Sequence, residues 1–166
     1  MQLTRRQALL LIPATFVQGC KVQSQPVLAQ SPAMTLPRKI LPDLAWSFKE
    51  PLPANPALFV SALRAYGESV KAPVVEAELQ SRFPLPSLDV EYTYAKQEDS
   101  GFWTDVPVKV RIRRSAPPTY AEVLFELHIA SAEKLQDQDH SYFEGLWLLD
   151  REYEKGIPVY ELYLGS

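Results

Sequence analysis

The chain has 166 residues, enough for one domain of ordinary size and too few for two. Apolar residues make up 46% and charged residues 22%, the balance of a globular protein rather than a disordered one. The net charge of −3 argues against a nucleic-acid partner, and the single cysteine excludes an internal disulfide and any metal cluster built on several cysteines.

Residues 1–19 have the pattern of an export signal. Arg5 and Arg6 precede an apolar run over residues 8–17, much shorter than the ~20 residues that a membrane-spanning helix needs. The sequence around the arginines, Thr-Arg-Arg-Gln-Ala-Leu-Leu, resembles a twin-arginine signal, which implies that the protein crosses the membrane already folded. A general secretory signal, in which the two charges only orient the chain, is the alternative.

The apolar run ends in Val-Gln-Gly-Cys, which resembles the lipobox of bacterial lipoproteins. This resemblance implies cleavage before Cys20, lipidation of its thiol and attachment to a membrane on the periplasmic or cell-envelope side. A second possible cleavage point follows Ala29, some distance beyond the apolar run.

Residues 20–54 are expected to form a tether that begins with the lipidated cysteine and leads to a domain over residues 55–166. Six of the fifteen prolines fall in this stretch, and proline interrupts helices and central strands. Near its end, Leu44, Trp46 and Phe48 alternate with small residues. This alternation indicates a short extended segment packed on the domain, with a ligand-facing Trp46 as the alternative.

Two helices are predicted with clear start signals. Asn55 followed by proline begins a helix over residues 56–70, and Thr119 followed three positions later by glutamate forms a capping box. The apolar stripe of this second helix reaches Leu135 and should cover a sheet. Residues 73–82 suit either a short helix or an edge strand.

Four strands are predicted in two hairpins. Apolar and polar residues alternate over residues 88–95 and 106–113, which are joined by a polar loop. Residues 142–149 and 157–164 form the second hairpin, with poorer alternation. The expected fold is a single α+β domain. It has about four strands in one antiparallel sheet, packed against two or three helices in the order α(α)ββαββ.

The first predicted hairpin carries a strip of basic residues over residues 109–114. Matching the apolar faces of its strands pairs Tyr92 with Val110 and places Asp89 opposite Arg113. Acidic partners on the neighbouring strand would neutralise much of the strip, which argues against a lipid or nucleic-acid surface there.

One set of side chains could serve as a metal or acid–base site: His128, Asp137, Asp139 and His140. Zinc binds these residue types, but the two histidines stand twelve positions apart across a helix end, a spacing that matches no ligand motif. The alternative is a histidine packed in the core and a solvated helix end. The sequence has no nucleophile elbow or glycine-rich phosphate loop, so no cofactor is predicted and an enzyme is disfavoured.

The remaining candidates for function are aromatic. Phe102 and Trp103 fall at the tip of the first hairpin, where they either meet a partner or fold back as a lid, and Tyr153 and Tyr160 are expected to add to a partner surface. We therefore expect a membrane-tethered, non-catalytic binding or assembly module with a protein partner. A small metal-dependent or acid–base enzyme is the alternative.

A third hypothesis is a ligand cavity between a helix and the sheet. Its lining would be Tyr92, Tyr94, Leu127 and His128, and a filled core at this place would remove it.

Overall fold

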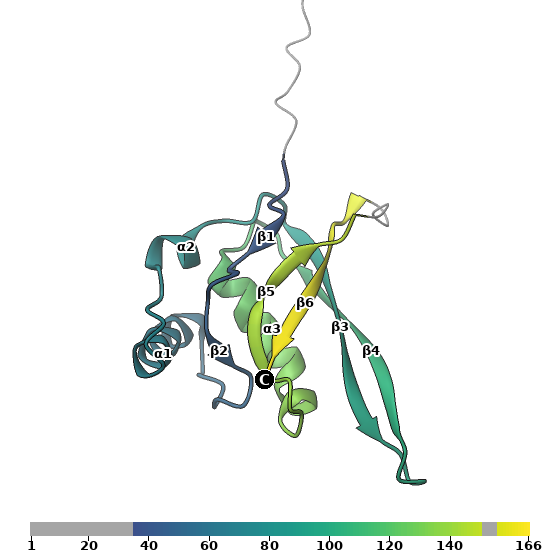
Figure 1. The fold of residues 1–166 in the computed structure, drawn as a ribbon. Helices are drawn as coiled ribbons and strands as arrows, with labels where there is room; N and C mark the ends of the chain where they lie inside the picture. The colour runs from purple at the N-terminus through teal and green to yellow at the C-terminus, as the bar shows by residue number, and fades with distance from the viewer. Residues whose placement is uncertain (1–34, 151–155) are drawn as a thin grey trace, which may run out of the picture. The chain divides into compact units, whose positions relative to one another are not determined.

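The computed structural model describes residues 35–150 and 156–166. In chain order the elements are β1 (Lys39–Ile40), β2 (Trp46–Ser47), α1 (Pro56–Ser69), α2 (Glu76–Gln80), β3 (Ser87–Gln97), β4 (Trp103–Arg113), α3 (Tyr120–Leu135), β5 (Tyr142–Leu148) and β6 (Val159–Gly165) (Figure 1). Arg5, Arg6, Cys20 and Tyr153 lie outside the described residues. None of the helices in the described ranges is long and apolar enough to cross a bilayer.

The two predicted helix starts are confirmed. At α1, the Asn55 side chain accepts a hydrogen bond from the Leu58 backbone N–H at 3.0 Å, and proline occupies the first turn. At α3, Thr119 and Glu122 satisfy each other's backbone N–H groups in a capping box. The ambiguous stretch over residues 73–82 contains the five-residue helix α2.

The part of the chain that the structure describes forms one sheet of six strands, so the prediction of about four strands, all antiparallel, was wrong. Its order is β1-β5-β6-β3-β4, and β2 also pairs with β5. The strand β6 lies between β5 and β3, and it is parallel to β3 because α3 carries the chain across the sheet before the second hairpin forms. The α+β class is as expected, but the sheet is mixed.

Residues 36–48, which the tether prediction includes, form a segment that we call the N-terminal strap. The strap supplies β1 and β2, and the Tyr160 hydroxyl donates a hydrogen bond to the Pro37 carbonyl at 2.8 Å. It also supplies five buried apolar side chains: Ile40, Leu41, Leu44, Trp46 and Phe48. The packed part of the chain therefore begins well before residue 55.

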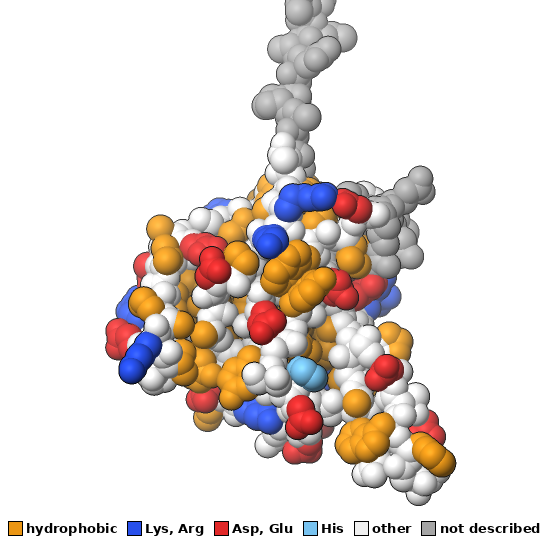
Figure 2. Space-filling model, in the orientation of Figure 1, with side chains coloured by type: hydrophobic (Ala, Val, Ile, Leu, Met, Phe, Trp, Pro, Cys, Tyr) orange, Lys and Arg blue, Asp and Glu red, His pale blue; other side chains and the backbone are white. Residues whose placement is uncertain are grey.

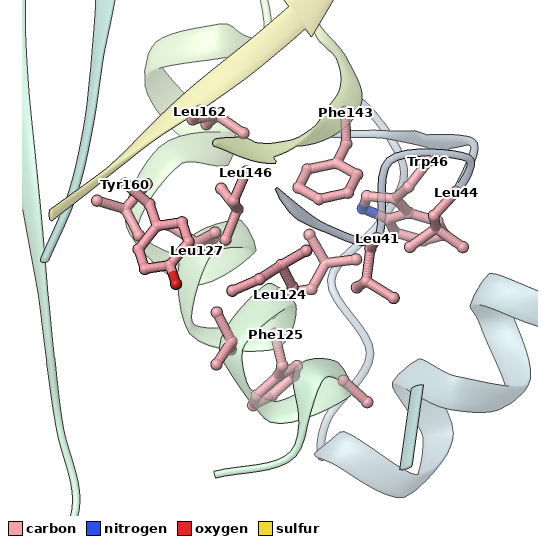
Figure 3. Packing of buried hydrophobic residues seen from close by; sticks show 14 of the residues in the cluster. Leu41, Leu44, Trp46, Leu124, Phe125, Leu127, Phe143, Leu146, Tyr160 and Leu162 are labelled. Atoms are coloured by element: carbon pink, nitrogen blue, oxygen red, sulfur yellow. The ribbon is translucent and has the colours of Figure 1, made fainter. Parts of the chain in front are cut away.

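The core lies between α3 and the face of the sheet that α3 covers. In Figure 3, Leu124 and Leu127 of α3 point toward Leu146 of β5 and Tyr160 of β6, while Trp46 approaches from the strap. Alternate residues of β3 reach the same cluster, since successive side chains of a strand point to opposite faces. The predicted role of α3 as the cover of the sheet is confirmed.

The predicted parity of the β3–β4 register is right, but the register itself is displaced by two residues. Tyr92 lies opposite Val108 rather than Val110. A shift of two positions keeps the same side chains on the same face, so the apolar pattern alone does not separate the two registers.

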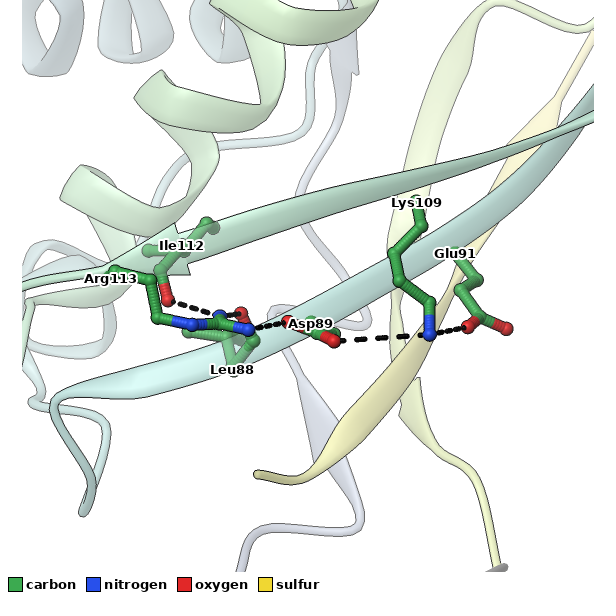
Figure 4. Close-up of polar contacts among 6 residues, drawn as sticks. All are labelled: Leu88, Asp89, Glu91, Lys109, Ile112 and Arg113. Carbon is green, nitrogen blue, oxygen red and sulfur yellow. Dashed lines mark hydrogen bonds and ion pairs between the residues drawn. The ribbon is translucent and has the colours of Figure 1, made fainter. Parts of the chain in front are cut away.

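Two of the basic side chains of β4, Lys109 and Arg113, are nonetheless paired with acids on β3 (Figure 4). Arg113 reaches diagonally to the buried carboxylate of Asp89 and also donates to the Leu88 carbonyl at 2.9 Å. The Lys109 ammonium lies 2.9 Å from Glu91 and 3.9 Å from Asp89. These contacts neutralise much of the basic strip, as the sequence predicted from a different register.

Candidate functional site

The distal half of the β3–β4 hairpin projects as a two-stranded arm, defined here as residues 93–106 (Figure 1). Pairing of β3 with β6 ends at Glu91, whereas pairing of β3 with β4 continues to Gln97 opposite Trp103. At ~3.4 Å per residue, the hairpin extends about 20 Å past its last contact with β6. The end of the arm is therefore held by few neighbours from the rest of the domain.

The tip of the arm, residues 97–105, exposes two large aromatic side chains. Phe102 is 75% exposed and Trp103 is 63% exposed. Figure 2 shows apolar side chains gathered at the end of the projecting part. The turn below them is well defined, because the Glu98 N–H donates to the Phe102 carbonyl at 2.8 Å and Gly101 adopts a φ of 84° that favours glycine. The tip thus presents the aromatics rather than folding them back as a lid.

The outer edge of the hairpin is protected against strand addition by Pro107, which lies opposite Thr93 at the base of the arm. The Arg114 N–H bonds to the Pro86 carbonyl, so the even-numbered residues of β4 direct their backbone groups toward β3. The odd-numbered residues, Pro107 among them, direct theirs toward the open edge. Because proline lacks an N–H, this edge is a poor template for another strand.

The inner edge of the arm is occupied by a side chain. The Ala95 N–H donates to the Gln138 side-chain oxygen at 3.0 Å, and the Gln138 amide donates to the Ala95 carbonyl at 2.9 Å. Gln138 thereby makes the two hydrogen bonds that a neighbouring strand would make. Because neither edge of the arm favours the addition of another strand, the surface that the arm offers to a partner is its tip.

An open groove of about 500 Å³ adjoins the tip, between the arm and the end of α3. Tyr94 and Trp103 line its apolar part, and its charged part is lined by Lys96, Lys134, Glu133 and Asp137. Neither sign of charge dominates this lining. The groove offers extra contact area beside the tip rather than a site for one small ion.

His128 lies in the core. Its ring is fully buried, and Nδ1 accepts a hydrogen bond from Trp46 Nε1 at 2.9 Å. The rings of Phe48 and Phe59 lie within 6 Å of it, at 5.7 and 5.9 Å between centroids. Since Nδ1 accepts, the proton of the neutral imidazole is on Nε2. Burial lowers the pKa of His128, and the backbone of Glu50 acts in the opposite direction.

The other members of the predicted metal set are not gathered around His128. Asp137, Asp139 and His140 are exposed beyond the end of α3. Within the described ranges, no group of three or more histidine, cysteine, aspartate or glutamate side chains is arranged to hold a metal ion. The structure therefore gives the metal-dependent hypothesis no geometric support.

Two other hypotheses from the sequence, a partner surface that includes Tyr160 and a ligand cavity between helix and sheet, place side chains where the structure has its core. Tyr160, expected on a partner surface, is fully buried, and its ring lies 5.7 Å from that of Phe83. Of the four residues expected to line a ligand cavity, Tyr92, Leu127 and His128 are also buried among core side chains. The fourth, Tyr94, is partly buried and lines the open groove beside the arm.

One residue that shapes the arm, Gln138, has no role in the sequence hypotheses. Gln138 lies among the polar residues after α3, and nothing in its sequence context indicates that it binds a strand 43 positions away. Trp46 is indicated as a packed aromatic or a ligand-facing one, but not as the hydrogen-bond partner of His128, which is 82 positions away.

Compared with family models, curated proteins and solved structures, the chain matches none of them.

Proposed function

We propose that this chain is an exported, membrane-tethered binding or assembly module without catalytic activity of its own, and that its arm docks on a protein partner. The observation that carries the proposal is the exposure of Phe102 and Trp103 on a well-defined turn. Aromatic side chains, tryptophan above all, contribute most of the binding energy at many protein interfaces. An exposed pair at a projecting tip suits insertion into a partner's pocket.

The signal-like residues at the start of the chain support the membrane-tethered part of the proposal. Arg5 and Arg6 before an apolar run, and Cys20 after it, resemble a twin-arginine signal and a lipobox. Export and lipidation would hold the domain at the membrane through the residues that precede the strap.

The direction of the strands supports an arm that points away from this attachment. The strand β1 is antiparallel to β5, β5 is antiparallel to β6, and β6 is parallel to β3. The strap therefore runs in the same direction as β3, and the chain enters the sheet from the end opposite to the arm (Figure 1).

Replacing both tip aromatics tests the docking surface. The variant Phe102→Ser/Trp103→Ser is expected to lose co-purification of partner proteins from native membranes by thirtyfold or more, since truncation of two such residues costs about 2–4 kcal/mol of binding energy. A matched control is Leu58→Ser/Ile129→Ser, because these side chains are 51% and 52% exposed on α1 and α3. Equal co-purification by both double variants would reject the tip as the docking surface.

Replacing the proposed lipid attachment point tests the tether. The variant Cys20→Ser is expected to move the protein from the membrane fraction to the soluble fraction, because no acyl chains would anchor it. Fractionation followed by immunoblotting measures the change, and Arg5→Lys/Arg6→Lys, expected to block export, gives the uncut chain for comparison. Uncut, unacylated wild-type protein dissolved inside the cell would contradict the proposal.

A further inference from the structure

The tip of the arm carries acidic charge around its aromatic pair. Residues 97–105 contain Glu98, Asp99 and Asp105 and no lysine or arginine, and the one basic residue elsewhere in the arm is Lys96. All three carboxylates belong to exposed residues. Glu98 is fixed in place by the Thr104 hydroxyl, which donates to it at 2.8 Å. The aromatic surface and the negative charge are therefore presented together.

This combination is poorly suited to a bilayer. Bacterial membranes and other anionic lipid surfaces attract basic segments and repel acidic ones. Insertion of the aromatics would also bring Asp99 and Asp105 to the headgroup region, at a cost in desolvation and charge repulsion.

The same combination suits a protein pocket with basic residues around it. Trp103 and Asp105 are two positions apart on β4, so their side chains lie on the same face of the arm. An aromatic anchor in an apolar pocket, surrounded by paired charges at the rim, is the usual anatomy of a specific interface. Opposite charges at such a rim speed association and select the right partner.

Building on the proposed function, we propose that the arm is recognised by a protein whose apolar pocket has a cationic rim. Phe102 and Trp103 fill the pocket, and Asp99 and Asp105 face lysine or arginine side chains of the partner. The bilayer is not the target of the tip.

A photoreactive side chain at the tip tests this proposal in the full-length, lipidated chain. Phe102 is replaced by p-benzoyl-phenylalanine, and native membranes are irradiated at low and at high ionic strength. We expect a protein adduct whose yield falls at least tenfold in the additional presence of Asp99→Lys/Asp105→Lys, and also falls as salt rises. The control Asp43→Lys/Glu68→Lys makes the same change in net charge on exposed residues away from the arm, and should leave the yield unchanged.

Vesicles test the bilayer directly. The Cys20→Ser chain, which cannot be acylated at that position, is mixed with vesicles of phosphatidylcholine alone or with 30% phosphatidylglycerol, and sedimentation measures binding. We expect no binding to either. Binding that is lost in Phe102→Ser/Trp103→Ser would overturn the proposal, as would a lipid adduct, no adduct, or a protein adduct insensitive to charge reversal.

The docking role of the tip and the cationic rim of the partner are rejected by different results. If the serine double variant still co-purifies the partner, the proposed function fails. If that variant loses the partner but Asp99→Lys/Asp105→Lys keeps it, only the cationic rim is rejected.

Discussion

Replacing Trp46 with alanine is expected to lower the free energy of unfolding by about 3–5 kcal/mol, the range for large aromatic side chains removed from a core. The indole is almost fully buried, and its ring lies 5.1 Å from that of Phe59 and 5.5 Å from that of Tyr66. Its removal leaves a cavity where the strap meets α1 and α3. It also leaves His128 Nδ1 without its donor, and a buried acceptor without a partner adds to the loss.

Urea denaturation followed by far-ultraviolet circular dichroism measures this loss without depending on tryptophan fluorescence. Trp103→Ala is the matched control, because the same change at a largely exposed position is expected to alter stability by no more than ~0.5 kcal/mol. Trp46→Phe keeps much of the ring but removes the N–H, so its stability should lie between those of wild type and Trp46→Ala. Similar stabilities for Trp46→Ala and Trp103→Ala would show that the strap is not part of the cooperative unit.

The local features of this fold were predictable because they depend on neighbouring residues. A capping asparagine or threonine acts on N–H groups two or three positions away, so Asn55 and Thr119 mark their helices in the sequence. The long strands β3 and β4 have a period of two along one face. These signals locate the elements to within a few residues.

The topology was not predictable from the same signals. The parallel contact between β3 and β6 joins residues about 70 positions apart, such as Val90 and Tyr160, and each strand would look the same beside another neighbour. The strands of the strap have only two residues each, too few to show a period. Alternation did mark Trp46 and its neighbours as packed, but not the strand that they join.

The candidate site also has one part that was predictable from the sequence and one part that was not. The hairpin loop predicts that Phe102 and Trp103 are at a tip, because a turn must lie between two alternating strands. Whether a tip is exposed depends on what packs against it. In this fold the pairing of β3 with β6 ends at Glu91, so β6 does not lie beside the distal part of the hairpin. His128 was ambiguous for a related reason, since its partner Trp46 comes from a distant segment.

The stability of the protein is expected to fall as the pH decreases below about 6.5, because of His128. Burial lowers the pKa of this imidazole in the folded state, whereas in the unfolded chain it has its ordinary value near 6.5. Below that value the unfolded chain binds a proton that the folded protein does not, so acid favours unfolding. The contribution is fully present above pH 6.5, decreases with a limiting slope of about 1.4 kcal/mol per pH unit, and levels off below the folded pKa.

The Trp46 hydrogen bond gives this effect a structural cause. Protonation of Nδ1 would place two N–H donors against each other where the strap meets α3, in a setting of aromatic rings. The variant His128→Asn puts a non-titrating acceptor near the position of Nδ1. Urea unfolding between pH 7.5 and 5 should therefore show a shallower pH dependence for His128→Asn than for wild type.

The control His140→Asn removes an exposed histidine and should keep the wild-type slope. Nitrogen-15 chemical shifts of the wild-type imidazole give a direct readout, with Nδ1 unprotonated and Nε2 protonated while the protein stays folded below pH 6.5. A His128 ring that protonates near pH 6.5 without loss of the native fold would contradict the argument. The acceptor role of Nδ1 would then contribute little to holding the strap on the core.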